Sequence, residues 1–453
     1  MASVYRSRGV LACATLSVLF WAGCSKPQPT GTGGTPAAPA SGPTTAVTPA
    51  PAAPPVKPTR PATANADDVK AARARIDALG GKSVYAPSVG DLLTTIIIPD
   101  GSNLTAADLA LFGKLSDLEK LSIKDCRALN DEMAAQLSGL KGLTSLALIN
   151  TIINDVTVEM IAKSFPHLID LDLSSNTNMT SSVVKLVSGM TQLQRLTLVQ
   201  NRVNDIGSMK LAKLQDLRAL DLRGNMEAGD MALEVVAALP KLTGFKHRST
   251  AVSDSGLEYL SHSQTLDSLL MQDFNVSSQS GPHLAKMGKL TQLEIFRCQG
   301  FGSEGVLALK GMGLTRLTLR DLPNVSDQAM EVFDDLPKLR RLFLWELASV
   351  SDTGLKHLSA LQSLEQLDIW SVPQLTDATV DVIVALPKLK DLTIRSTGVT
   401  DAAVDKLLGM KGLQSLKFYD NGSVTAEGAK KLGTRKWKTL ELGTSGSGEP
   451  AAP

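Results

Sequence analysis

One short pattern of leucines recurs at a nearly constant interval over most of the chain. The pattern is L-x-x-L-x-L, and its central residue returns every 24 or 25 positions. With a degenerate first and last copy there are fifteen, with central residues Ile96, Leu121, Leu146, Leu171, Leu196, Leu220, Phe245, Leu269, Leu293, Leu317, Leu342, Leu367, Leu392, Leu416 and Leu440. So regular an interval is typical of repeat proteins, in which similar units stack on one another.

The spacing within each copy predicts one strand and one helix. The L-x-L alternation is the period of a strand with one buried face. A turn follows, and then helically spaced apolar residues such as Leu355, Leu358 and Leu361. Neither element buries its apolar face alone, so neighbouring units must stack. Because helices are wider than the roughly 4.8 Å strand spacing, we expect an α/β solenoid that curves into a horseshoe over residues 93–442. Parallel strands would lie on its concave face and helices on its convex face.

Residues 90–442 resemble the leucine-rich-repeat family, specifically its ribonuclease-inhibitor-like and cysteine-containing subclasses. A second recurring signature supports this resemblance, since the family shows a similar Ser-Asp or Thr-Asp pair in the turn. The pairs here are Asn130-Asp131, Asn154-Asp155, Asn204-Asp205, Ser253-Asp254, Ser326-Asp327, Ser351-Asp352, Thr376-Asp377 and Thr400-Asp401. We interpret them as helix caps, with the Asp near the positive end of the helix dipole, rather than as a metal ladder.

The segment 1–24 reads as a secretory signal. Arg6 and Arg8 precede an apolar run from Gly9 to Gly23, which is too short to span a bilayer. The segment from Trp21 to Cys24 resembles a bacterial lipobox, although Trp21 stands where Leu is usual. This resemblance implies a lipid on Cys24, with ordinary secretion as the alternative. It places the protein at the cell envelope, and Ser25 favours the outer membrane if the sorting rule of enteric bacteria applies.

The remaining flanking segments have distinct compositions. Residues 25–65 are rich in Pro, Ala and Thr, which predicts a disordered linker, either passive or a spacer from the membrane. Residues 66–92 are predicted to form an N-terminal capping helix and lead-in, with Asn65 as helix cap and with the strand 92–98. Residues 443–453 are predicted to be a disordered tail.

Composition argues against several function classes. With 46 Lys+Arg against 45 Asp+Glu there is no basic excess for nucleic acid. A catalytic histidine needs a nucleophile and an orienting acid within reach, and no two of the five histidines share a repeat or a face that would supply them. The sequence contains neither a phosphate-binding glycine loop nor a zinc-spaced cluster. We therefore expect no enzyme activity, cofactor or metal site, and we interpret His247 as a hydrogen-bonded core residue.

Cys126 and Cys298 each follow the last apolar residue of a repeat by three positions. The equivalent residues elsewhere are Thr151, Asn176, Asn201, Asn225, Thr250, Thr397 and Asn421. This position is expected to point inward and to meet buried turn amides. The two cysteines are seven repeats apart, about 34 Å at the strand spacing, whereas a disulfide needs Cα atoms within roughly 7 Å. They should be free, buried thiols.

The residue after the last apolar position of each repeat should face the concave surface. In six consecutive repeats it is aromatic or arginine, and we call these residues the aromatic–arginine row: Phe296, Arg320, Trp345, Trp370, Arg395 and Tyr419. Phe343 faces the same way, and Arg316 and Arg341 flank the row.

Aromatic residues and arginine dominate binding hot spots. The row therefore predicts a site for a protein partner, with a glycan or cell-wall polymer as the alternative. A purely structural stack of rings is the other interpretation. If the row is a site, removing Trp345 and Trp370 together should abolish binding and leave stability nearly unchanged.

Overall fold

The computed structural model describes residues 64–85 and 92–443. The signal segment with Cys24, the linker up to residue 63 and the tail from residue 444 lie outside the described residues.

Sixteen strands form one sheet in which their order along the sheet follows their order in the chain. They are β1 (Lys82–Tyr85), β2 (Leu93–Ile98), β3 (Lys120–Lys124), β4 (Ser145–Ile149), β5 (Asp170–Asp172), β6 (Arg195–Thr197), β7 (Ala219–Asp221), β8 (Gly244–Arg248), β9 (Ser268–Gln272), β10 (Gln292–Phe296), β11 (Arg316–Arg320), β12 (Arg341–Trp345), β13 (Gln366–Trp370), β14 (Asp391–Arg395), β15 (Ser415–Tyr419) and β16 (Thr439–Gly443). Strands β2 to β16 correspond to the fifteen copies of the leucine pattern.

Each connection between parallel strands is helical. The α-helices are α1 (Ala66–Ala78), α2 (Ala106–Phe112), α3 (Asp131–Ala135), α4 (Asp155–Ser164), α5 (Val183–Val187), α6 (Asp205–Ser208), α7 (Asp230–Ala237), α8 (Asp254–Leu260), α9 (Ser280–Ala285), α10 (Ser303–Leu307), α11 (Asp352–Leu355), α12 (Asp377–Val384), α13 (Asp401–Gly409) and α14 (Ala426–Leu432). The 3-10 helices are η1 (Gln136–Gly139), η2 (Met209–Lys213), η3 (Asp327–Asp335) and η4 (Lys356–Ala360).

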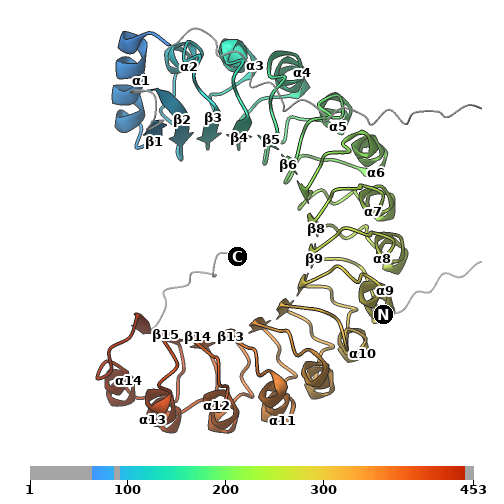
Figure 1. Ribbon diagram of the computed structural model, residues 1–453, viewed down its shortest axis with the longest axis vertical. Helices are drawn as coiled ribbons and strands as arrows, with labels where there is room; N and C mark the ends of the chain where they lie inside the picture. Colours follow the sequence, from blue (N-terminus) through green and yellow to red (C-terminus); the bar gives the residue numbers. More distant parts are fainter. Residues whose placement is uncertain (1–63, 86–91, 444–453) are drawn as a thin grey trace, which may run out of the picture. The chain divides into compact units, whose positions relative to one another are not determined.

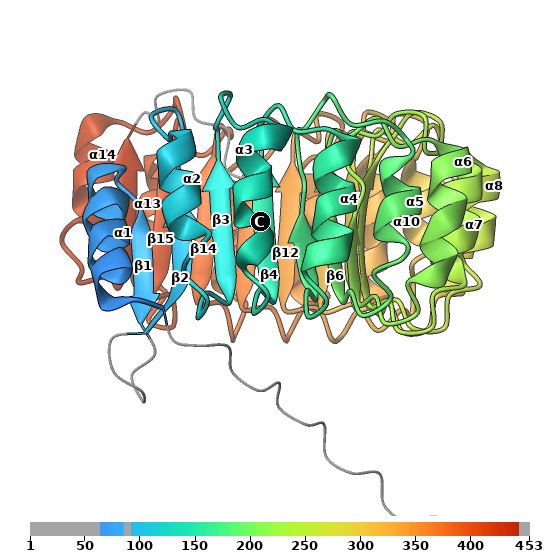
Figure 2. The same cartoon turned by 90° about the horizontal axis from the view of Figure 1, so that it is seen from above.

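The repeats curve as the difference in width between helix and strand predicts. Figure 1 shows the strands lining the inner side of the arc and the helices covering its outer side. In Figure 2, helices α1 to α4 stand side by side in front of the strands. Among the described residues, no helix combines the length and apolar character that crossing a bilayer requires. The α/β solenoid expected from the leucine interval is confirmed.

The core lies between the sheet and the helices, where the leucines of the pattern are fully buried. Leu342 and Leu344 of β12, for example, have no exposed surface. Neighbouring strands pair in register, so that Leu344 lies opposite Leu319 on one side and Ile369 on the other. Because alternate residues of a strand point to opposite faces, this register also places every concave residue beside its equivalents.

The N-terminal end of the solenoid is covered by α1 and β1. Helix α1 starts where Asn65 accepts a hydrogen bond from the amide of Asp67, and it buries Ala72 and Ile76. Strand β1 pairs antiparallel with β2, whereas all other pairs are parallel. The sequence did not indicate this short strand, since its four residues carry no leucine pattern.

A ladder of buried polar side chains runs through the turns after the strands. The amide of Asn225 is representative: it donates to the carbonyls of Leu198 and Leu222 and accepts from the amides of Asn201 and Val203. This confirms the inward position expected for the Cys, Asn and Thr residues.

Thr250 is the exception, because it is exposed and Ser249 is buried in its place. Ser249 donates to the carbonyl of Met226. The neighbouring turns contain a residue with positive φ, such as Asp273, but the Ser249 turn does not. In this turn the inward-pointing residue is therefore Ser249, one residue earlier than in the neighbouring repeats.

The turn aspartates do more than favour the helix dipole. The carboxylate of Asp352 accepts hydrogen bonds from the amide and hydroxyl of Thr376, the helix cap of the next repeat, at 2.9 and 2.6 Å. All eight aspartates of the recurring pairs accept a hydrogen bond from a backbone amide of the following repeat. These bonds join consecutive repeats, a role that the sequence pattern did not reveal.

Candidate functional site

The concave face carries the aromatic–arginine row as one continuous line of side chains. Strand pairing places Phe296 beside Arg320, Arg320 beside Trp345, and Trp345 beside Trp370. Arg395 and Tyr419 follow on β14 and β15. These residues alternate with buried core leucines and isoleucines along their strands, so their side chains point away from the helices. The sequence placed these residues on one face, and the sheet register brings them together.

Arginines and rings pack against one another along the row. The guanidinium of Arg320 lies 4.2 Å from the ring centre of Phe296, 5.6 Å from that of Trp345 and 5.3 Å from that of Trp370. Arg395 lies 5.0 Å from the Trp370 ring. Trp345 meets Trp370 and Phe343 edge to face, with centroids 6.2 and 5.6 Å apart. Cation–π and edge-to-face contacts of this kind fix the orientation of each side chain.

Acidic residues beside the row accept hydrogen bonds from its polar side-chain groups. Glu346 accepts a hydrogen bond from Arg320 at 3.0 Å, and Asp420 accepts one from Arg395 at 3.2 Å. The indole nitrogen of Trp345 donates to Asp368 at 2.7 Å. Burial raises the pKa of Asp368 above its ordinary value, although the Trp345 hydrogen bond opposes this shift. The guanidinium groups of Arg320 and Arg395 and the indole of Trp345 therefore have hydrogen-bond partners within the protein before any ligand binds.

Tyr419 ends the row and donates its hydroxyl to Glu441. Burial, together with this bond and the nearby carboxylate charge, raises the pKa of Tyr419 to about 12. The pKa of Glu441 is lowered, because it accepts that hydrogen bond and lies beside Lys417. Tyr419 stays a neutral hydrogen-bond donor across the physiological pH range.

Burial divides the row, together with the neighbouring Phe343, into an inner and an outer group. Trp345 is 4% exposed, and Arg320 and Phe343 are each 6% exposed. Phe296, Trp370, Arg395 and Tyr419 are only half-buried. The ring stack thus stabilises the sheet as well as forming a surface. The expectation that removing Trp345 leaves stability unchanged is not consistent with its burial.

A polar hollow of about 410 Å³ lies beside the row, at the start of the strands. Both flanking arginines line it, together with Gln292, Thr315, Arg340, Glu365, Gln366 and Asp391. Arg316 stacks 5.0 Å from the Phe343 ring centre and lies 3.2 Å from Glu294. Arg341 is exposed. A bulky apolar surface and a hollow with donors and acceptors therefore lie side by side on β10 to β14.

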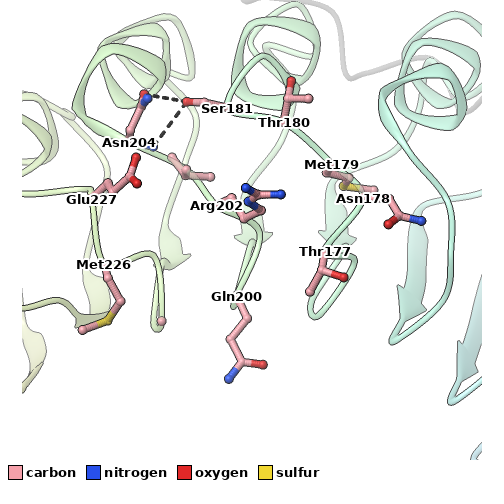
Figure 3. A pocket seen from close by; sticks show the side chains of 12 residues that line it. Thr177, Asn178, Met179, Thr180, Ser181, Gln200, Arg202, Asn204, Met226 and Glu227 are labelled. Carbon is pink, nitrogen blue, oxygen red and sulfur yellow. Dashed lines mark hydrogen bonds between the residues drawn. The ribbon is translucent and has the colours of Figure 1, made fainter.

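A second hollow, of about 710 Å³, lies elsewhere, on the rim where strands β5 to β7 lead into helices. Figure 3 shows Arg202 between the loop with Thr177 and Asn178 and the loop with Met226 and Glu227. Sequence reasoning missed this surface, because it depends on loop residues outside the leucine pattern.

The remaining candidate residues are part of the core. His247 is fully buried, with Nδ1 3.1 Å from the carbonyl of Leu222 and Nε2 2.8 Å from that of Ala228, as expected for a core histidine. Cys126 and Cys298 are free and buried, and burial raises the pKa of Cys298 to about 12. In the part of the chain that the structure describes, no group of three or more His, Cys, Asp or Glu side chains is arranged to hold a metal ion.

Comparisons with known proteins find similarity only at the level of structure. No protein-family model and no curated protein matches the chain. A chain of the yeast Rad7–Elc1 complex is 18% identical with a TM-score of 0.52, over 85% of this chain and 90% of that one. The fold is a leucine-rich-repeat solenoid.

Two further leucine-rich-repeat structures are similar. An internalin from Listeria monocytogenes is 20% identical over 78% of this chain and 95% of its own, with a TM-score of 0.45. A chain of the TLR13–ssRNA13 complex is 16% identical over 74% of this chain and 62% of its own length, with a TM-score of 0.40. At these identities the similarity concerns the fold alone.

Proposed function

We propose that this solenoid is a non-enzymatic binding module that holds a protein partner against its concave face. The proposal further places the module at a bacterial cell envelope, anchored by a lipid on Cys24 and separated from the membrane by the linker of residues 25–65. The lipobox-like segment and the Pro/Ala/Thr-rich composition of the linker support this second part.

The aromatic–arginine row is the observation that carries the proposal. Six neighbouring strands present only rings and guanidinium groups there, and contacts within the protein already fix their orientation. Binding to such a surface costs little side-chain ordering, which is a main cost of association. Half-buried Trp370 and Tyr419 supply large contact area, and the adjacent hollow with exposed Arg341 supplies polar contacts.

The ring geometry favours a protein over a glycan. A sugar stacks best on a broad, open ring face, but the Trp370 ring has guanidinium groups 5.3 and 5.0 Å from its centre, from Arg320 and Arg395. Trp345 is almost fully covered. Protein side chains can interdigitate with such a surface, because they vary in size, shape and polarity.

The test is affinity capture from cells of the source organism, followed by binding measurements with the purified partner. Trp370→Ala removes a half-buried ring, and Arg341→Glu reverses an exposed charge in the adjacent hollow at the start of the strands. Tyr259→Ala, on the exposed side of helix α8, is the matched control. We expect one defined protein, bound by the wild type and the control and at least tenfold more weakly by both concave variants.

Equal affinity for all four proteins would contradict the concave assignment. Binding to a glycan array that is lost only in Trp370→Ala would support the carbohydrate alternative instead.

A further inference from the structure

A second surface, on the rim of the solenoid, gathers exposed apolar side chains. Six of the ten exposed large apolar residues among those described fall between positions 152 and 231: Ile152, Val156, Ile206, Met209, Met226 and Met231. Ile206 is 72% exposed and Met226 is 38% exposed. Such side chains are common singly, but their concentration in a few successive repeats marks a patch suited to interaction.

The repeat register explains why a hollow opens within this patch. Val156, Ser181, Ile206 and Met231 follow one another at an interval of one repeat, so they occupy the same position near the start of successive helical segments. Three of them are large and apolar, whereas Ser181 is small. Two neighbouring hollows, of about 710 and 240 Å³, both include Ser181 and Asn204 in their walls. Met226 lines the first and Ile206 the second.

The backbone at Arg202 is unusual. Its φ angle is 59°, in the left-handed region that non-glycine residues rarely adopt. The other non-glycine residues with positive φ occupy one position of the repeat, directly after the last concave residue of the strand. Gln200 is the residue at this position in the repeat that contains Arg202. Arg202 does not occupy it. A strained residue that places a long cationic side chain in the hollow of about 710 Å³ points to a functional role.

Charge identifies the chemistry of an occupant. Lys185 and Lys210 line the second hollow and Arg202 the first, while Glu227 is the only acid in either wall. All four are exposed. Within the described residues, none of the three cations has an ion-pair partner. A ligand with carboxylates and an aliphatic or aromatic side chain would match both the charges and the apolar rim.

We propose that the two adjoining hollows, which we call the rim groove, bind a peptide segment of a partner protein that carries both acidic and apolar side chains. The chain's own N-terminal segment 1–63 does not fit as occupant, since it contains five Lys or Arg and no Asp or Glu. The groove lies outside the aromatic–arginine row, so this proposal does not depend on concave binding.

An array of twelve-residue peptides of systematically varied sequence, probed with the full chain, tests the proposal. We expect retention of peptides that combine Asp or Glu with Leu or Phe, and at least a tenfold loss with Arg202→Glu. Arg202→Gly should lose binding equally while folding normally, because glycine tolerates φ of 59°. Ile206→Ser should weaken binding of the same peptides.

Arg127→Glu is the matched control. Arg127 is an exposed arginine that occupies the position of Arg202 three repeats earlier, outside the hollow. Its substitution, like Trp370→Ala, should leave retention unchanged. The proposal is overturned if Arg127→Glu and Arg202→Glu weaken binding alike, if basic peptides are preferred, or if no class of peptide is retained.

Discussion

Two neighbouring tryptophans of the aromatic–arginine row should differ sharply in their effect on stability. Trp345 is 4% exposed and Trp370 is half-buried. A tryptophan buries about 150–250 Å², which at about 25 cal/mol per Å² gives about 4–6 kcal/mol. This is an upper bound because unfolded chains already bury some surface, and core Trp→Ala changes cost about 3–5 kcal/mol. We therefore expect Trp345→Ala to lower the free energy of unfolding by about 4 kcal/mol, and Trp370→Ala by roughly half of that.

Urea unfolding followed by far-UV circular dichroism measures both changes without relying on the fluorescence of the altered residues. Trp345→Phe is the control, since it keeps a ring but loses the hydrogen bond to Asp368. We expect it to fall between Trp345→Ala and the wild type, with an unchanged denaturant slope. If Trp345→Ala costs less than about 1 kcal/mol, or no more than Trp370→Ala, the inner half of the row is not a packed layer.

Other predictions follow from single contacts. Asn225→Ala removes one hydrogen bond from each of four backbone groups, of which the Leu222 carbonyl keeps His247 as a partner. The change should cost about 3 kcal/mol or more in urea unfolding, and a loss below about 1 kcal/mol would contradict the ladder. Burial raises the pKa of Asp352, but the hydrogen bonds from Thr376 and Thr379 outweigh it, so the folded pKa lies below the unfolded one. Its stabilisation is complete above pH ~4 and is lost as pH falls through the folded value. Asp352→Asn should therefore destabilise the protein at pH 6 and much less at pH 2, as compared by urea midpoints. For Asp368 the pH dependence of stability has the opposite sign, because burial raises its pKa in the folded state. The protonated carboxyl of Asp368 contributes its full stability below the unfolded pKa, and this stability is lost as pH rises through the folded pKa. Asp368→Asn, which stays neutral, should therefore stabilise the protein at pH 7 and not at pH 3. Cys298, buried with a pKa of about 12, should react with a thiol reagent only on unfolding, as peptide mapping would show; fast labelling of native protein would refute its burial.

The solenoid was predictable because its cause is periodic. A leucine pattern that returns every 24 or 25 positions fixes which side chains point inward, and the sheet register then aligns equivalent positions. The same arithmetic placed Trp345 and Trp370 in one row. It also predicted that Asn225 is buried in its turn, because Asn, Thr or Cys recurs at the same position of many repeats.

The remaining features depend on contacts that no period encodes. Trp345 is buried because Arg320, Phe343 and Trp370 pack around it, and predicting this requires knowing the positions of all three side chains at once. The turn at Ser249 omits a residue with positive φ, and this shift changes which residue points inward. The rim hollow arises from a small Ser181 between larger equivalents, a comparison that becomes meaningful only once the loops are placed.

Site-specific photo-crosslinking tests the proposed concave binding most directly. A photoreactive phenylalanine analogue replaces Trp370 on the concave row in one variant and Tyr259 on helix α8 in another, and both are irradiated in cells of the source organism. The concave position should yield a covalent adduct with one defined protein, and the helical position should not. An adduct formed only from position 259, or none from position 370 in a variant that folds normally, would contradict binding by the concave face.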